Sequence, residues 1–371
     1  MKKLLCAVMI VIVLIVSAPV ISAAEVETSA AAFALYCPDN GEMLLSENAD
    51  RELPMASTTK IMTTVLTLEA AARDNRVVEF TDEMTAEGSS MYLKRGEKVT
   101  LYDLAVGMMM QSGNDAANAA ALALSDSYEH FAALMNEKAR QLGMKHTHFV
   151  TPNGLDDDDH YSTARDMALL MNYAMRNEDF AYITAQTSME VHFVYPADKF
   201  VTYPNHNKLL RMDKDCIGGK TGYTDQAGRC LVTAARRDGI TLIAVTLDDR
   251  NDWKDHIALY DEGFARYERI TVGNDSVVLD VVGGVQDAVK ASAAEASVVI
   301  PKGSPELTKR VCLPAFVYAP VEAGERLGTI EYSLQDKVLI ELPLTADESV
   351  GYLNQKRSII NYIKDLLHWH S

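Results

Sequence analysis

A serine and a lysine lie three residues apart where an apolar run begins, in the segment MASTTKIM at 55–62. Residues at positions i and i+3 of a helix share one face, so the Ser57 hydroxyl and the Lys60 amine are predicted to point together. A serine is an effective nucleophile only when a base takes its proton, and a lysine is such a base only when burial or a nearby cation keeps it neutral. The pattern predicts an activated serine, although a surface lysine on an amphipathic helix gives the same spacing.

The segment Ser112-Gly113-Asn114 interrupts a helical pattern between Met110 and Asp115. We expect Gly113 to permit a tight corner from which the two polar side chains project. Ser112 can relay a proton from such a corner, and Asn114 can hold a substrate amide. An ordinary turn between two helices is the competing interpretation.

The segment Lys220-Thr221-Gly222 follows Gly218-Gly219 and leads into a predicted hairpin, which places it on an edge strand. Lys220 supplies a second positive charge and Thr221 a hydroxyl. Gly222 is expected to let a ligand approach the backbone closely. This triplet is the rarest of the three motifs at average composition.

Apolar residues at helical spacing predict the helices that position these motifs. One helix carries Ser57 and Lys60, and Thr100 with Asp103 resembles a capping box at the start of the next. The predicted helices span 57–72, 100–110, 115–124, 128–142, 163–175 and 255–267.

Two hairpins are predicted among these helices, at 31–45 around Asp39-Asn40-Gly41 and at 229–247 around Asp238-Gly239. Helices, then a strand meander, then a further helix indicate an antiparallel sheet flanked by helices, an α+β arrangement. We therefore expect one domain over 25–270 to hold all three motifs.

The last third of the chain has a different sequence pattern, of short strands without helical spacing. Short β-rich runs at 276–282, 297–300, 327–332 and 337–344 alternate with Gly and Pro turns, which predicts a small all-β domain over 271–348. From Ser349 to Ser371 the pattern predicts an amphipathic helix with Lys356, Arg357 and Lys364 beside its apolar face. That helix can lie in a membrane interface or pack against its own domain.

The first 24 residues read as a signal peptide, because Lys2 and Lys3 precede an apolar run that ends in small residues at Ala24. An uncleaved membrane anchor is the alternative. The prediction is an exported protein that acts at the outer face of the cytoplasmic membrane or in the cell wall.

Charge and cysteine content exclude several classes of function. The chain of 371 residues carries 35 basic and 52 acidic side chains, a net charge of −17, which argues against a nucleic-acid partner. Beyond the leader it has Cys37, Cys216, Cys230 and Cys312 with no C-x-x-C spacing, which argues against a zinc or redox site. Cys216 and Cys230 can pair, or can be small buried residues of a sheet.

The three motifs occur in one order, 55 and then 108 residues apart, and the set S-x-x-K, S-D-N and K-T-G marks class A β-lactamases and penicillin-binding proteins. Here Gly113 stands where that pattern has Asp. The blocks at 88–119, 151–168, 218–239 and 319–332 extend the likeness over about 30–350. The chain resembles the low-molecular-mass penicillin-binding proteins, the serine-type D-alanyl-D-alanine carboxypeptidases, and a β-lactamase/transpeptidase-like fold is implied.

The resemblance implies a role for each motif residue. Ser57 is the acylated nucleophile and Lys60 its base, while Ser112 passes a proton to the leaving amine and Asn114 completes the site. Lys220 supports proton transfer. The residues implied in substrate binding are Lys220, Thr221, Gly222 and Tyr223, the first two facing the terminal carboxylate and the Tyr223 N–H joining that of Ser57 in an oxyanion hole. Arg250 and His206 are further candidates for that carboxylate.

The implied substrate is a peptidoglycan stem peptide that loses its terminal D-alanine, with β-lactams as inhibitors, no cofactor and no metal. A serine β-lactamase is the alternative, but no E-x-x-L-N pattern lies between Asn114 and Lys220. A metal-dependent peptidase would use the run Asp156–His160, yet H-E-x-x-H is absent. A non-catalytic wall-binding protein would lack Ser57, Lys60 or Lys220.

Overall fold

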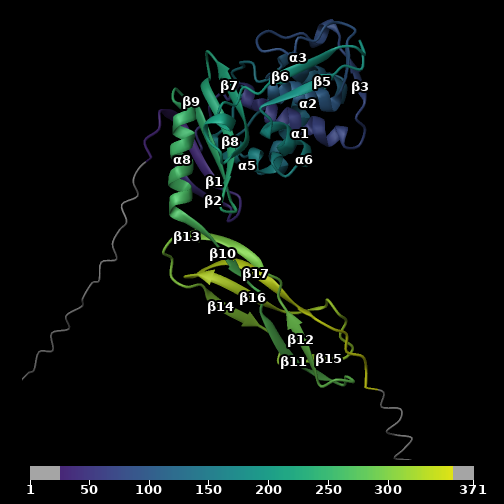
Figure 1. Cartoon of the computed structure of the whole chain (residues 1–371), viewed down its shortest axis with the longest axis vertical. Coiled ribbons are helices and arrows are strands. Elements are labelled where there is room, and N and C mark those ends of the chain that lie inside the picture. Colours follow the sequence, from purple (N-terminus) through teal and green to yellow (C-terminus); the bar gives the residue numbers. More distant parts are fainter. Residues whose placement is uncertain (1–25, 354–371) are drawn as a thin grey trace, which may run out of the picture.

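The computed structural model describes residues 26–353, which form two domains (Figure 1). The first is built on a five-stranded antiparallel sheet in the order β2-β1-β9-β8-β7. Its strands are β1 Ala30–Cys37, β2 Glu42–Glu47, β7 Cys216–Thr224, β8 Gly228–Arg237 and β9 Ile240–Asp249. Both predicted hairpins are confirmed, and the strand with Lys220 is an edge strand as expected.

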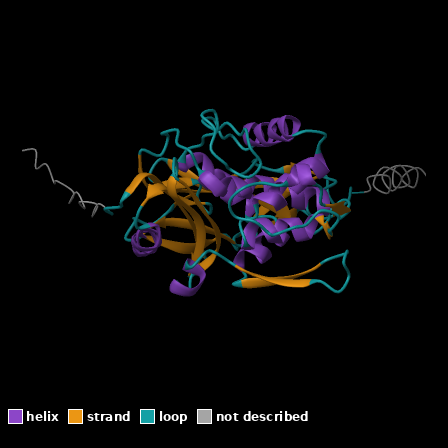
Figure 2. Cartoon of the chain, turned by 90° about the horizontal axis from the view of Figure 1, so that it is seen from above, coloured by secondary structure: helices purple, strands orange, loops and turns teal. Residues whose placement is uncertain are grey.

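Helices cover both faces of this sheet, as Figure 2 shows from above. On one face α8 Asp252–Arg266 packs against β1, β8 and β9. On the other face α5 Ala164–Ala174 contacts β1 and β9, and further helices pack on the same side. Those helices are α1 Lys60–Ala71, α2 Leu101–Met110, α3 Asn114–Leu124, α4 Tyr128–Gln141 and α6 Glu178–Ala185. The short α7 Leu209–Met212 lies on the face covered by α8, where Leu209 joins the buried cluster with Leu259 and Tyr260. The predicted α+β class is confirmed.

The start of α1 differs from the sequence prediction of a single helix from Ser57. A 3-10 turn at Ala56–Thr59 comes first, and the α-helix begins at Lys60. The predicted capping box is present at α2, where the Thr100 N–H donates to Asp103 Oδ2 at 2.9 Å and Thr100 Oγ1 accepts from the Asp103 N–H at 3.2 Å.

Several short elements escaped the sequence patterns. The strand pairs β3 Val77–Glu79 with β4 Lys98–Thr100, and β5 Ser188–His192 with β6 Phe200–Pro204, lie outside the main sheet. Three-residue strands carry no readable alternation. The pair β5 and β6 is exposed at most positions, so it lacks the alternating apolar face that marks a strand.

The second domain is all-β, as predicted, with a buried apolar cluster of its own. Strands β10 Tyr267–Val272 and β13 Ala296–Pro301 pair with each other. A six-stranded sheet follows in the order β14-β16-β17-β12-β11-β15. Its strands are β11 Ser276–Val282, β12 Ala288–Ser292, β14 Thr308–Cys312, β15 Val317–Tyr318, β16 Arg326–Leu334 and β17 Lys337–Ala346.

The predicted C-terminal helix is wrong for its first five residues. Val350 bridges to Val321 and Tyr352 bridges to Gly284, so 349–353 continues the β domain in extended conformation. The rest of that predicted helix and the predicted signal peptide lie outside the described residues. Within 26–353 no helix combines the length and apolarity needed to cross a membrane.

The two cysteines left open by the sequence are both free thiols in the structure. Cys216 pairs in register with Ala235, whereas Cys230 pairs with Gly222, six residues further along β7. The two side chains are therefore on separate parts of the hairpin. Burial raises the pKa of the Cys216 thiol to about 11 and that of Cys230 to about 12.

Candidate active site

The three motifs meet at one cleft of about 300 Å³, between the 3-10 turn, the corner joining α2 to α3, and the edge strand β7. Ser57, Ser112, Thr221, Gly222 and Tyr223 line it. Lys60, Asn114 and Lys220 lie behind this lining and contact it through hydrogen bonds. Residues more than 150 positions apart in the sequence thus share one site.

Lys60 is fully buried, with 0% of its surface exposed. Its Nζ lies 2.8 Å from Ser57 Oγ, 2.6 Å from Asn114 Oδ1 and 2.6 Å from the Asn153 carbonyl oxygen. The last two atoms can only accept hydrogen bonds. A neutral amine has two N–H groups for them, which leaves its lone pair toward the Ser57 hydroxyl.

The electrostatic surroundings favour that neutral amine. Burial, with a smaller contribution from the Lys220 cation, holds the pKa of Lys60 well below its usual value, and the Asp115 carboxylate opposes the shift. Low polarity penalises the charged form of a lysine, and a like charge nearby penalises it further. The chemistry expected of a base beside a serine is therefore available here.

Asn114 is held in one orientation by both ends of its amide. Its Nδ2 donates to the Glu87 carbonyl at 2.6 Å, so its Oδ1 faces Lys60. The next residue, Asp115, accepts from the N–H groups of Met91 and Leu93 and fastens the loop over the cleft. Sequence reasoning did not single out Asp115.

The corner between α2 and α3 carries its strain at Ser112, where φ is +58°, and not at Gly113, where φ is −59°. Gly113 lies in a tight corner, as expected, but with an ordinary backbone angle. Gly113 is needed for space, because a Cβ there would lie 2.9 Å from Asp115 Oδ1 and 3.0 Å from the Met91 nitrogen. The resulting geometry aims Ser112 Oγ at Lys220 Nζ, 3.0 Å away.

Lys220 is 2% exposed, and its Nζ also donates to the Thr221 carbonyl at 2.7 Å. Burial lowers the pKa of Lys220 to about 7. Gly222 lines the cleft, and it has in addition a packing role that the sequence did not predict. A Cβ there would lie 2.9 Å from the Met55 carbonyl oxygen and 3.1 Å from the Ser57 nitrogen, so the glycine admits the turn with Ser57.

The segment 151–154 supports the turn from the other side. Gly154 has φ +81°, and a Cβ there would lie 2.0 Å from the Ala56 carbonyl oxygen. Asn153, whose carbonyl contacts Lys60, donates through Nδ2 to Asn118 Oδ1 at 2.9 Å. Neither residue was marked by the sequence analysis, because a backbone acceptor leaves no signature in side-chain type.

His160, raised by the sequence as part of a cation site, has another task. Its Nδ1 accepts from the N–H groups of Val150 and Thr151, at 2.9 and 3.2 Å, so its Nε2 carries the proton toward Thr59 Oγ1 at 2.8 Å. Burial lowers the pKa of His160 to about 4. Within 26–353 no group of three or more His, Cys, Asp or Glu has the arrangement of a metal site.

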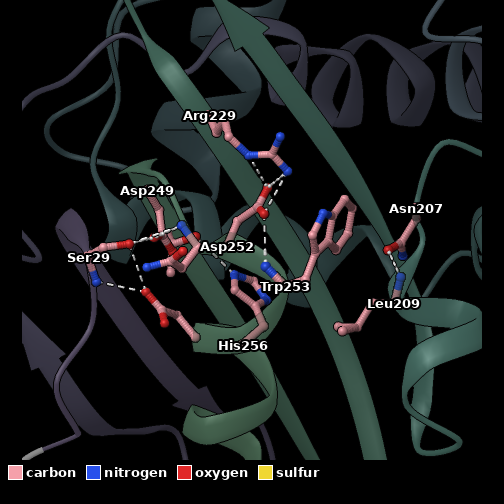
Figure 3. Close-up of polar contacts among 11 residues, drawn as sticks. Ser29, Asn207, Leu209, Arg229, Asp249, Asp252, Trp253 and His256 are labelled. Carbon is pink, nitrogen blue, oxygen red and sulfur yellow. Dashed lines mark hydrogen bonds and ion pairs between the residues drawn. The ribbon is translucent and has the colours of Figure 1, made fainter.

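Arg229 and Lys208 give the cleft a positive wall, and Arg250 does not line it. His206 lines the cleft as well, but burial and the nearby Lys220 charge lower the pKa of His206 and favour its neutral form. Arg229 lies opposite Tyr223 on β8, one residue from the turn of the hairpin with β7. Its guanidinium makes a bidentate ion pair with Asp252 at the start of α8, with Nη2 2.7 and 2.9 Å from the two carboxylate oxygens (Figure 3). The sequence analysis did not single out Arg229; the signal that could have found it is its place after Gly228, across the hairpin from the K-T-G motif.

A family model of D-alanyl-D-alanine carboxypeptidases, peptidase family S11, matches residues 19–251, and one of the penicillin-binding protein 5 C-terminal domain matches 268–352. D-alanyl-D-alanine carboxypeptidase DacF of Bacillus subtilis is 31% identical, over 98% of this chain and 97% of its own length. The chain belongs to the D-alanyl-D-alanine carboxypeptidase family.

Further similarities extend this assignment. The D-alanyl-D-alanine carboxypeptidase DacC of Escherichia coli is 34% identical over 84% of this chain and 82% of its own length. The crystal structure of penicillin binding protein 5 from Haemophilus influenzae superimposes with a TM-score of 0.70 at 29% identity, over 88% of this chain and 98% of that one. As a member of this family the chain is a serine-type carboxypeptidase.

Proposed function

We propose that this D-alanyl-D-alanine carboxypeptidase acts on peptidoglycan stem peptides through an acyl-enzyme on Ser57. The observation that carries the assignment is the position of Lys60 Nζ, 2.8 Å from Ser57 Oγ with two fixed acceptors on its other side. Proton transfer needs such a separation and a base that is neutral at working pH. Ser112 also contacts a buried lysine amine, that of Lys220 at 3.0 Å, but Lys220 has one further acceptor, the Thr221 carbonyl, where Lys60 has two.

In the first step Ser57 Oγ attacks the carbonyl carbon between the last two D-alanines, and its proton passes to Lys60 Nζ. The N–H groups of Ser57 and Tyr223 receive the oxyanion, each contributing about 3–4 kcal/mol. The proton then moves through Ser112 to the leaving nitrogen, and the C–N bond breaks. Water hydrolyses the ester, which releases the shortened peptide and restores Ser57.

Recognition of the terminal carboxylate falls to Thr221, Lys220 and Arg229. Arg229 replaces Arg250 in this role, because Arg229 lines the cleft and its side chain is 44% exposed there. The ion pair with Asp252 holds the guanidinium in place, and Trp253 lies beside it, with 5.9 Å from Arg229 Cζ to the ring centre (Figure 3). A guanidinium so held retains N–H groups for an incoming carboxylate.

Intact-mass analysis after incubation with penicillin tests the nucleophile. One covalent penicillin per chain is expected, located by peptide mapping on Ser57 and absent from Ser57→Ala. Acylation of any other residue contradicts the assignment. Rapid multiple turnover of penicillin would instead support the serine β-lactamase alternative.

Replacing Arg229 tests the carboxylate site. Arg229→Gln is expected to lower kcat/KM about 10²-fold on a peptide with a free terminal carboxylate, since a charge-assisted pair is lost. An ester substrate that lacks this carboxylate should lose little. Arg250→Gln is the matched control, and an equal loss in both variants contradicts the role given to Arg229.

The predicted location follows from the family's substrate, which lies outside the cytoplasm. We infer export through the leader at 1–24, and peripheral membrane contact through 354–371, where Lys356 and Arg357 precede an apolar run that also contains Lys364. Fractionation of cells that express the full chain and a chain ending at Leu353 tests both inferences. Recovery of the full chain in the cytoplasm contradicts them.

A further inference from the structure

An apolar tip closes the second domain at the end opposite the active site. Three segments are joined there by backbone hydrogen bonds: the Val285 N–H donates to the Gly351 carbonyl at 2.9 Å, the Leu353 N–H to the Gly283 carbonyl at 2.8 Å, and the Ala319 N–H to the Val282 carbonyl at 3.0 Å. Figure 1 shows β11 and β15, which form this tip, far from α1, α2 and α3. The tip is therefore one surface and not a set of scattered residues.

The side chains of the tip are apolar, although they face solvent. Each is between 42% and 69% exposed. The six residues are Val282, Val285, Phe316, Tyr318, Tyr352 and Leu353. Soluble proteins seldom gather so many large apolar groups in one place unless another surface covers them.

The residue types of the tip indicate what kind of surface covers it. Half of its residues are aromatic, and two are tyrosines, whose apolar ring and polar hydroxyl suit the boundary between lipid and water. The flanking charged residues Asp280 and Asp287 are exposed and acidic, so attraction to anionic headgroups does not arise from the tip itself. Contact with lipid there depends on apolar burial alone.

The chain leaves the described structure from this same tip. Leu353 is followed by 18 residues, 354–371, that combine six Ile, Leu and Trp residues with Lys356, Arg357 and Lys364. Any attachment of that segment to a bilayer places the tip within a few residues of the lipid. The cleft, at the other end of the molecule, would then face away from the membrane.

We propose that this tip rests on a lipid bilayer surface, as a contact separate from residues 354–371. Tyr318, Phe316 and Val285 enter the headgroup region, and the second domain stands between the bilayer and the active site. The proposal is independent of the reaction assigned to Ser57.

Vesicle partitioning of the chain lacking residues 1–24 tests the proposal. The tip variant Val285→Ser, Phe316→Ser, Tyr318→Ser is compared with Val77→Ser, Tyr182→Ser, Phe200→Ser, which removes the same residue types at exposed positions of the first domain. We expect the tip variant to bind neutral phosphatidylcholine vesicles about tenfold more weakly, at low and high salt alike, because apolar burial is lost. The control is expected to bind as the wild type does.

A second pair of proteins separates the tip from residues 354–371. The chain ending at Leu353 should keep weak binding to neutral vesicles, and the same tip substitutions should abolish it. Equal binding by the tip variant and its control overturns the proposal. It is also overturned if truncation at Leu353 leaves no binding, or if the tip substitutions change the oligomeric state without lipid. Penicillin acylation at the wild-type rate shows that the first domain of each variant is folded, and an unchanged second-domain melting temperature in scanning calorimetry shows that the tip domain is folded.

Discussion

Two buried lysines share the cleft, and each is more costly to keep charged there than in water. Lys60 sits among obligate acceptors beside the nucleophile, whereas Lys220 contacts Ser112 and a backbone carbonyl. Burial also lowers the pKa of each. Substitutions of these two lysines therefore test the protonation chemistry of this enzyme.

Lys60→Arg tests the need for a neutral base. A guanidinium keeps its proton in proteins, so the rate constant for acylation by penicillin should fall about 10²–10⁴-fold, the usual contribution of a positioned base. Stopped-flow measurement of acylation gives the value. Lys98→Arg, at an exposed ion pair with Glu79, is the control, and near-normal acylation by Lys60→Arg would count against the base.

Lys220 should impose a pH dependence on stability. Its pKa is about 7 in the folded chain, against 10.5 for an ordinary lysine. Between those pH values the unfolded chain holds a proton that the folded chain has released, so the free energy of unfolding rises with pH, and the full penalty applies below pH 7. From pH 7 to pH 10 the wild type should gain on the order of 3 kcal/mol relative to Lys220→Met.

Urea unfolding at a series of pH values measures that difference. Lys208→Met, which removes a lysine that lines the same cleft, should follow the wild type. Parallel profiles for the wild type and Lys220→Met would show that Lys220 titrates normally.

At the scale of elements, the site depends on close approach between β7 and the turn that precedes α1. Gly222 makes this possible, since a Cβ there meets backbone atoms of Met55 and Ser57. Backbone cannot move aside as the end of a flexible side chain can. A side chain added at Gly222 of β7 therefore displaces the turn that carries Ser57.

Gly222→Ala is expected to displace the turn with Ser57 and to cost about 1–3 kcal/mol of stability, as overpacking does. Penicillin acylation should slow together with the fall in melting temperature. Gly351→Ala is the matched control, because nothing lies within 4 Å of a Cβ at that position. Normal acylation by Gly222→Ala would mean that the turn tolerates separation from β7.

The elements that sequence patterns predicted are those with strong amphipathic periodicity or clear turn residues. The helices containing Met110, Phe131 and Met167 have buried faces at regular spacing, and the hairpin turn at Asp238-Gly239 has two positive φ angles. The 3-10 turn at Ser57 was missed because its residues read as helix formers within a longer run. Tertiary contact with β7 and 151–154, not local preference, shapes it.

For the candidate site, short motifs predicted which residues would gather, and the structure places all of them at one cleft or just behind it. Their catalytic roles stay predictions. The sequence could not predict the supporting residues, because Asn153 acts through its carbonyl oxygen and Gly154 through the absence of a side chain. Arg229 was missed for another reason: strand pairing, and not sequence proximity, brings it to the cleft.

At the scale of the whole molecule, the two domains share packing as well as a covalent connection. Val299 of β13 belongs to the same buried cluster as Tyr260 and Phe264 of α8. The Lys302 N–H donates to the Arg266 carbonyl at 2.7 Å across the same junction. We therefore expect the unfolding of one domain to be coupled to that of the other through this junction.

Val299→Ser should weaken that junction by about 1–3 kcal/mol, because buried methyl groups are lost. Scanning calorimetry is expected to show the second domain melting at a lower temperature than in the wild type, while penicillin acylation at 25 °C is unchanged. Val311→Ser, at a 40% exposed position of β14, controls for the substitution itself. A fall in acylation with no change in melting would contradict a purely structural junction.

The residue before the nucleophile and the proton relay itself have left-handed backbone without being glycine: Ala56 with φ +47° and Ser112 with φ +58°. Each such conformation costs about 1–3 kcal/mol and persists only where surrounding contacts enforce it. Selection for heat resistance alone would remove both strained turns and, with them, the alignment of the two hydroxyls. The enzyme's tolerance to heat is thus limited at the same two turns that make it reactive, and improvements in durability must come from regions remote from the cleft.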